Sequence, residues 1–156
     1  MNKYLIFRTD RIGDFLLTAI LIKSIKRNDP NSSIYIVASE RNYNYIKSFK
    51  FIDNVVLLNN NFISKLRIIN YLKSIKFTAI IIHDSKNRSN LISFFLKKNI
   101  RIMPKTNSKI SYINEIKKIL SNLNFNFNEL DLNTLNDRIY NKSKFPDENY
   151  IQLHQP

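Results

Sequence analysis

The feature that most constrains the fold is a regular alternation of short apolar runs with amphipathic segments. The apolar runs are rich in β-favouring residues and predict strands, and each is followed by apolar residues at helical spacing. The predicted strands are 4–7, 33–39, 54–58, 78–82 and 100–103, and the predicted helices are 15–26, 40–50, 62–75, 89–98 and 112–123. Because each connecting helix is long enough for a crossover, this order predicts an α/β fold with a mainly parallel sheet and helices on both faces.

The alternation stops after residue 123. Residues 124–149 are rich in asparagine and acidic residues and lack apolar periodicity, so we expect an extended connector. Residues 150–154 again predict a strand, which would begin a further unit at 150–156. A length of 156 residues with 44% hydrophobic composition suits one domain with a real core, which we place at residues 1–123.

The chain carries a formal charge of +13 at neutral pH. Such an excess predicts attraction to an anionic partner, whether nucleic acid, an acidic membrane face or a phosphorylated sugar. Abundant Asn, Ile and Lys with scarce Ala and Gly are typical of AT-rich genes, and we assign roughly half of the excess to this bias. No recognition helix or RNA-binding aromatic signature accompanies the charge, so we expect no nucleic acid as partner.

The composition also bounds the compartment. With no cysteine, the chain has neither a disulfide framework nor a thiolate metal site, which fits a reducing cytoplasm. Two histidines far apart, His83 and His154, do not suggest zinc. No apolar run approaches the ~20 residues that span a bilayer, and charged Arg8 and Asp10 interrupt the N-terminal apolar run, which excludes a signal peptide. We expect a cytoplasmic protein.

The loop after the first predicted strand concentrates charge. Arg8, Asp10, Arg11 and Asp14 lie within seven residues and surround Gly13, the only glycine of the chain. Asp14 directly precedes the predicted helix and could serve as its N-cap, and capping alone would explain that one residue. The glycine would allow a positive φ or let a ligand approach the backbone closely. Ligands bind at this edge of open α/β sheets, so we expect a binding site here.

These residues also carry a family resemblance. The run Arg8-Thr9-Asp10-Arg11-Ile12-Gly13-Asp14, with Thr18 in the helix that follows, resembles the N-terminal signature of glycosyltransferase family 9. That family comprises the ADP-heptose:lipopolysaccharide heptosyltransferases and their relatives. The resemblance is close over this loop and helix and continues further only as a pattern of elements.

The resemblance implies a fold and an activity. The fold would be the Rossmann-like N-terminal, acceptor-side domain of a GT-B-type glycosyltransferase that is inverting and metal-independent and uses no cofactor. The donor would be a nucleotide sugar, ADP-heptose by analogy, and the acceptor a lipopolysaccharide core or a related anionic glycan. Most of the donor site would lie in a second domain beginning near residue 150, so this chain alone would be incomplete for activity.

The resemblance also implies roles for residues of the first loop. The aspartate after the glycine is the family's proposed catalytic base, which carries over to Asp14. Arginine offers a bidentate fork to phosphate or carboxylate, so Arg8 and Arg11 are expected to hold an anionic acceptor. Asp10 would either hold one of these arginines or bind sugar hydroxyls. The substrate-binding residues expected from this stretch are Arg8, Asp10, Arg11, Gly13 and Thr18.

A second polar loop, residues 83–88, follows the most apolar predicted strand. In the family a polar stretch at this place faces the acceptor cleft, which implies Asp84, Lys86 and Arg88 as further substrate-binding residues. The alternative is structural, with Asp84 or Ser85 capping the next helix. The residues themselves leave both open.

Other functions also stay open. The chain would alternatively be a non-catalytic Rossmann-like module that binds an anionic glycolipid or a protein partner. A basic nucleic-acid binder is the less favoured reading, since only charge suggests it. Peripheral contact with the inner face of the cytoplasmic membrane is compatible with either glycan-related function.

Overall fold

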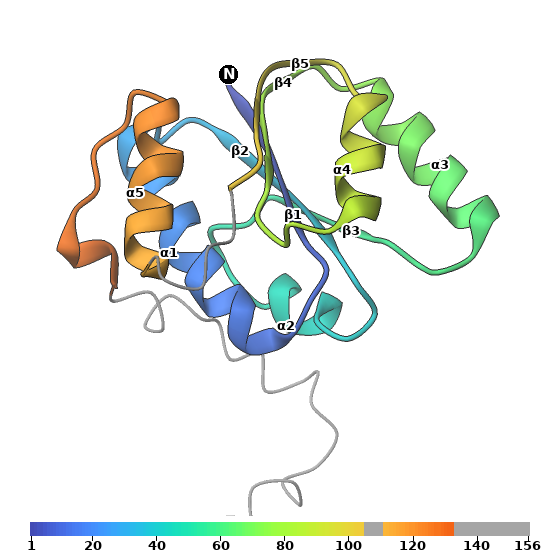
Figure 1. The fold of residues 1–156 in the computed structure, drawn as a ribbon, viewed down its shortest axis with the longest axis horizontal. Coiled ribbons are helices and arrows are strands. Elements are labelled where there is room, and N and C mark those ends of the chain that lie inside the picture. The colour runs from blue at the N-terminus through green and yellow to red at the C-terminus, as the bar shows by residue number, and fades with distance from the viewer. Residues whose placement is uncertain (105–110, 133–156) are drawn as a thin grey trace, which may run out of the picture.

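A computed structural model describes residues 1–104 and 111–132 of the chain (Figure 1). Five strands form one sheet: β1 (Lys3–Arg8), β2 (Ser33–Ala38), β3 (Asn54–Leu57), β4 (Phe77–Ile82) and β5 (Lys98–Ile102). Their order is β3-β2-β1-β4-β5, and every neighbouring pair is parallel. This confirms the predicted α/β fold with a parallel sheet.

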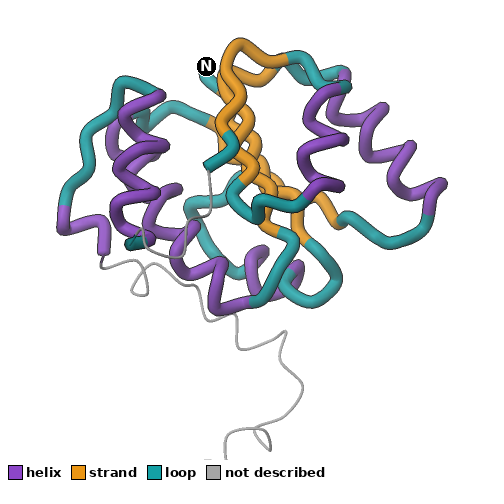
Figure 2. The backbone as a smooth tube through the Cα atoms, in the orientation of Figure 1, coloured by secondary structure: helices purple, strands orange, loops and turns teal. Residues whose placement is uncertain are grey.

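Helices cover both faces of the sheet (Figures 1 and 2). The helices are α1 (Ile12–Asn28), α2 (Tyr43–Lys47), α3 (Phe62–Lys73), α4 (Asn87–Phe94), α5 (Tyr112–Asn122) and the short 3₁₀ helix η1 (Glu129–Leu132). Side chains of α1, α2 and α5 share one core cluster, and those of α3 and α4 share the other. No helix in residues 1–104 and 111–132 is long and apolar enough to cross a membrane.

The central strands explain why the core has two halves. Successive side chains of a strand point to opposite faces. In β1, Tyr4 and Ile6 join the cluster under α1 and α5, whereas Leu5 and Phe7 join the cluster under α3 and α4. Burial on both faces requires an apolar side chain at nearly every position, which is the uninterrupted pattern in the sequence.

The second helix is shorter than the sequence predicts. The predicted helix 40–50 is wrong at its start, because α2 begins only at Tyr43 and residues 39–41 belong to the loop after β2. The aromatic residues near α2 lie in the core: the Phe49 and Phe15 rings meet edge to face with centroids 5.1 Å apart. In α3, Leu66 is exposed although it falls in the apolar pattern of the helix.

The predicted connector begins later than residue 124. Phe125 and Phe127 pack against the core cluster beside α1, and η1 follows them. Within η1, the Asp131 carboxylate is buried and accepts hydrogen bonds from the Arg27 side chain and from the Ser24 hydroxyl at 2.7 Å. The domain therefore includes residues up to at least 132. The rest of the expected connector and the strand expected at 150–154 lie outside the described residues.

Candidate functional site

A pocket of about 540 Å³ opens at the carboxyl edge of the sheet. Four loops build it, those after β1, β2, β3 and β4, each of which leaves its strand at the same edge because the strands are parallel. The lining residues are Thr9, Asp10, Arg11, Asp14, Ser39, Glu40, Arg41, Leu58, Asn60, Lys86 and Arg88.

The strand order accounts for this location. The chain places β2 on one side of β1 and β4 on the other, so the loops after β1 and β4 diverge toward helices on opposite faces. Such a switch point leaves a crevice outside the carboxyl ends of the strands, where open α/β folds bind their ligands.

Asp14 lines the pocket from the first turn of α1, but it is not the N-cap. The helix begins at Ile12, and Arg11, with extended backbone angles, is the N-cap residue without a side-chain capping bond. The expectation that Asp14 caps the helix is therefore wrong, since Asp14 lies three residues inside that boundary. A carboxylate in the first turn is still favoured by the positive end of the helix dipole.

Gly13 does not adopt a positive φ, so one of its two expected roles is wrong. It lies in the first turn of α1 in ordinary helical backbone. A Cβ built on it would meet no atom within 4 Å, so packing within the protein does not require a glycine either. Space for a ligand near the backbone is the role that remains.

Arg8 is buried and is not part of the pocket lining. Its Nε and Nη2 donate to the Asp14 carbonyl oxygen at 3.0 and 2.6 Å. Its Nη1 donates to the His83 carbonyl oxygen at 2.7 Å and to Asp10 Oδ2 at 3.0 Å. Arg8 was expected to bind an anionic acceptor, but the residue is 4% exposed, lies outside the pocket lining and joins the start of α1 to the end of β4.

Asp10 holds Arg8 in place, which is one of the two roles between which the sequence left a choice. Its Oδ2 pairs with Arg8, and its Oδ1 is buried without a hydrogen-bond partner although the residue lines the pocket. Burial raises the pKa of Asp10 against the lowering effect of Arg8, and the carboxylates of Asp14 and Asp84 add to the increase. An unpaired buried carboxylate oxygen can accept a hydrogen bond from a bound ligand.

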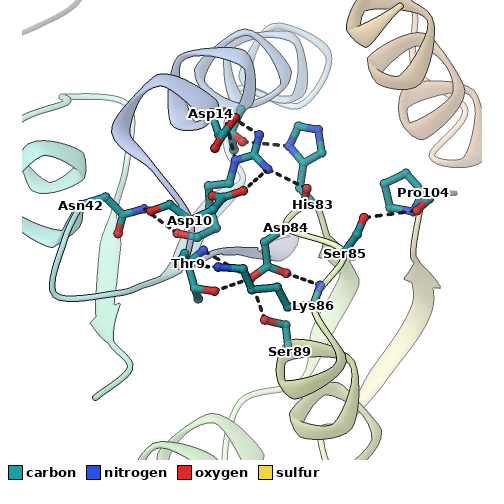
Figure 3. A network of polar contacts seen from close by, with 12 residues as sticks. Thr9, Asp10, Asp14, Asn42, His83, Asp84, Ser85, Lys86, Ser89 and Pro104 are labelled. Carbon is teal, nitrogen blue, oxygen red and sulfur yellow. Dashed lines mark hydrogen bonds and ion pairs between the residues drawn. The ribbon is translucent and has the colours of Figure 1, made fainter. Parts of the chain in front are cut away.

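Asp84 joins the loops after β1 and β4 and does not line the pocket (Figure 3). Its Oδ2 accepts from the backbone N–H and hydroxyl of Thr9 and from the Ser89 hydroxyl, while its Oδ1 accepts from the Lys86 N–H. Because both oxygens are engaged within the protein, we correct its expected substrate contact. The capping alternative is also wrong, since the N-cap of α4 is Lys86.

Lys86 and Arg88 reach into the pocket from the loop after β4 and the first turn of α4. Their side chains donate to the same acceptor, the Thr9 carbonyl oxygen, at 3.0 and 3.3 Å. Ser85, between Asp84 and Lys86, has a φ of 50°, an uncommon conformation outside glycine. This turn directs the two cations back toward the loop after β1.

Thr18 was expected to contact substrate, but it is fully buried and lies outside the pocket lining. Its Oγ1 lies 2.8 Å from His83 Nδ1, and the Nε2 of that ring lies 3.6 Å from Glu115 Oε1 of α5. Burial, with the Arg8 charge, lowers the pKa of His83 to about 3, and burial raises the pKa of Glu115. The neutral ring shares a hydrogen bond at Nδ1 with the Thr18 hydroxyl, while its Nε2 faces Glu115.

The loop after β2 contributes residues that sequence reasoning missed. Ser39, Glu40 and Arg41 line the pocket, and Asn42 behind them is buried. Asn42 Nδ2 donates to the Arg8 carbonyl oxygen at 2.9 Å, and its Oδ1 accepts from the Ser39 N–H at 2.9 Å. Their position at the end of a predicted parallel strand could have identified them, but the predicted strand includes Ser39 and the predicted helix includes Glu40 and Arg41.

The pocket thus carries charges of both signs. Its cations are Arg11, Arg41, Lys86 and Arg88, and its carboxylates are Asp10, Asp14 and Glu40. This arrangement can hold an anionic group on guanidinium and ammonium donors while a carboxylate accepts from a hydroxyl of the same ligand. Within residues 1–104 and 111–132, no group of three His, Cys, Asp or Glu side chains is placed to hold a metal ion.

The fold is that of solved glycosyltransferases. The structure of E. coli heptosyltransferase WaaC with ADP superposes with a TM-score of 0.67 at 11% identity, over 81% of this chain and 49% of that one. The glycosyl transferase family 9 protein of Veillonella parvula DSM 2008 superposes with a TM-score of 0.63 at 11% identity, over 82% and 42%. For E. coli ADP-heptose lps heptosyltransferase II the TM-score is 0.55 at 13% identity, over 66% and 30%.

These likenesses confirm the expected resemblance at the level of fold. The chain spans about half the length of the WaaC structure. It spans less than half of the other two solved structures. No protein-family model and no curated protein sequence matches the chain.

Proposed function

We propose that this chain is the acceptor-binding domain of an inverting glycosyltransferase. The reaction would transfer a sugar from a nucleotide sugar to a lipopolysaccharide core or a related anionic glycan. By analogy with the matched heptosyltransferases, the sugar would be heptose. The observation that carries the proposal is the place of Asp14: it lies in the first turn of α1, in a pocket with four cationic side chains at the switch point of a heptosyltransferase-like fold.

The cations of the pocket suit an acceptor that carries negative charge. Arg11 and Arg41 come from two different loops on one side, while Lys86 and Arg88 come from the loop after β4. An acceptor bearing phosphate or carboxylate groups would be held between these donors by charge-assisted hydrogen bonds. Its hydroxyls would meet the carboxylates of Asp10 and Glu40, which accept hydrogen bonds.

Asp14 would take the proton in the chemical step. As the acceptor oxygen bonds to the anomeric carbon, the bond from that carbon to the diphosphate oxygen breaks, and its electron pair leaves with the nucleoside diphosphate. The acceptor proton passes to the Asp14 carboxylate, which acts as general base. We prefer Asp14 to Asp10 for this role, because one oxygen of Asp10 is already paired with Arg8.

The donor would be an adenine nucleotide sugar. The matched WaaC structures contain ADP or ADP-2-deoxy-2-fluoro heptose, and we extend that ligand class to the enzyme containing this domain. The pocket described here would then form the acceptor side of a larger site. The metal-independent mechanism belongs to the same proposal, with pocket cations stabilising negative charge in place of a metal.

The test is an Asp14→Asn substitution in the enzyme that contains this domain, assayed for transfer from ADP-heptose to an anionic core oligosaccharide. Losing the base should lower kcat by about 10²- to 10⁴-fold while the KM for acceptor stays within a few-fold. Glu129→Gln, an exposed carboxylate on η1, is the matched control and should keep full activity. Near-normal kcat for the Asp14→Asn enzyme would refute the assignment of the base.

A further inference from the structure

A stripe of large apolar side chains is exposed at the end of α4. Leu91, Phe94 and Phe95 lie at i, i+3 and i+4, so they share one face of the helix and its C-cap. Their exposed fractions are 62%, 61% and 53%, whereas the neighbouring Ile92 and Leu96 are buried. Two adjacent exposed phenylalanines cost solvation free energy unless a partner covers them, which marks an interaction surface.

Cations from the neighbouring elements surround these rings. Lys73, at the end of α3, has its Nζ 5.6 Å from the centre of the Phe95 ring. Arg101, from β5, has its Cζ 4.2 Å from the centre of the Phe94 ring. Lys97 follows directly in the turn to β5 and is exposed. We call Lys73, Leu91, Phe94, Phe95, Lys97 and Arg101 the α4 surface.

In the part of the chain that the structure describes, neither Lys73 nor Arg101 forms an ion pair with a carboxylate. Between Asp53 and Glu115 the sequence contains a single acidic residue, Asp84. Asp84 follows β4 at the carboxyl edge of the sheet, where Thr9 and Ser89 engage it. The α4 surface includes the turn that leads into β5, at the opposite, amino edge (Figure 1). The surface is therefore apolar at its centre and positive around it.

We propose that the α4 surface docks the protein on an anionic lipid bilayer. Phenylalanine and leucine insert at the level of the headgroups, while lysine and arginine pair with acidic lipid phosphates. A second copy of the same surface is a poor partner, because pairing it with itself would bring its cations together. Nucleic acid would match the charge but would leave Leu91 without a partner.

The docking leaves the pocket accessible. The α4 surface lies at the amino edge of the sheet and the pocket at its carboxyl edge, so the two do not share residues. The proposal does not depend on glycosyl transfer, since it rests only on the exposed rings and the surrounding charge. Failure of one proposal therefore leaves the other standing.

The test is co-sedimentation of the full chain with lipid vesicles at ~0.1 M salt, where exposed charges are screened beyond about 10 Å. Vesicles of phosphatidylglycerol mixed with phosphatidylcholine are compared with phosphatidylcholine alone. The chain should bind the anionic vesicles at least about tenfold more strongly. The Phe94→Ser/Phe95→Ser variant should lose at least about tenfold in partition coefficient, because the two exposed rings that would insert into the bilayer are removed. Lys73→Glu/Lys97→Glu should lose a similar factor.

Leu130→Ser is the matched control, since Leu130 is 70% exposed but lies on η1 beside acidic Glu129. It should bind vesicles like the unaltered chain, and all variants should keep the same melting temperature because the changed side chains are exposed. Equal binding to neutral and anionic vesicles, or unchanged binding by Phe94→Ser/Phe95→Ser, would overturn the proposal. So would binding to duplex DNA, steeply weakened by salt, without binding to vesicles.

Discussion

The guanidinium of Arg8 donates hydrogen bonds to three different segments. It binds the first turn of α1 through the Asp14 carbonyl oxygen and the end of β4 through the His83 carbonyl oxygen. It also binds the loop after β1 through the Asp10 carboxylate. Only a planar guanidinium can make all of these hydrogen bonds, because Nε and Nη2 both donate to the same carbonyl oxygen. The place of the Asp14 carboxylate in the pocket therefore depends on a buried cation.

An Arg8→Lys variant of the full chain should consequently lose stability. One ammonium cannot reach all of these acceptors, so at least one buried carbonyl or carboxylate oxygen loses its donor. We expect the free energy of unfolding to fall by about 2–3 kcal/mol in denaturant titration. Arg11→Lys, at the exposed N-cap of α1, is the control and should stay within about 0.5 kcal/mol. Equal stability of the two variants would show that Arg8 does not hold the loops together.

At the scale of elements, a buried polar contact joins α1, the end of β4 and α5. Thr18 and Glu115 approach the two ring nitrogens of His83 from different helices. Because the folded protein holds this ring neutral down to about pH 3, the unfolded chain binds its proton first as the pH falls. In that range the unfolded state carries more protons, so this histidine makes the fold less stable with acidification.

Replacing His83 should therefore flatten the pH dependence of stability. Asp10 and Glu115, with raised pKa values, act in the opposite sense, so the comparison must be between variants. Between pH 6.5 and about 4, His83→Asn should lose less stability per pH unit than the unaltered chain, by up to about 1.4 kcal/mol. Thr18→Val keeps the ring and should keep the steeper slope at a lower stability. Identical slopes for the unaltered and His83→Asn chains would contradict the neutral buried ring.

The elements themselves could be predicted from local pattern. Strands β1 and β4 are buried on both faces, and a nearly continuous apolar run in the sequence reflects that burial. The start of α2 could not be read in this way. The Asn42 side chain accepts from the Ser39 N–H and turns the chain before the helix, which leaves Glu40 and Arg41 in the pocket. Helical periodicity does not reveal such a local turn.

The division of the site between pocket and support could not be predicted either. Arg8 and Arg11 look alike in the sequence, yet one is buried and the other exposed, because the partner of Arg8 is a carbonyl oxygen 75 residues away. Similarly, Asp84 lies outside the pocket lining whereas Lys86 is part of it, because Thr9 of another loop donates a hydrogen bond to the Asp84 carboxylate. Contacts this distant in sequence leave no periodic pattern, so only their positions at the carboxyl edge were predictable.

At the scale of the whole molecule, the two faces for which we propose functions lie on opposite edges of one sheet. The pocket, which contains both carboxylates and cations, lies at the carboxyl edge of the sheet. The α4 surface lies at the amino edge. A rigid parallel sheet separates them, so lipid docking and glycan binding need not compete. This arrangement suits an enzyme whose acceptor is displayed on a membrane, which is the class of acceptor we propose.

The central claim is that the pocket holds an anionic sugar next to Asp14. The most direct measurement is a titration of the ¹⁵N-labelled chain with glucose 6-phosphate, followed by amide chemical shifts, with glucose as the neutral comparison. Shifts should concentrate in the loops after β1, β2 and β4, and glucose should cause few.

Three variants make the measurement decisive. Arg41→Ala should weaken binding by about tenfold, because a charge-assisted hydrogen bond is lost, whereas Lys50→Ala, exposed outside the pocket, should not. Asp14→Asn should retain affinity, since the proposed base acts on a hydroxyl and not on the phosphate. Shifts confined to other surfaces, or equal responses to glucose and its phosphate, would contradict the acceptor site.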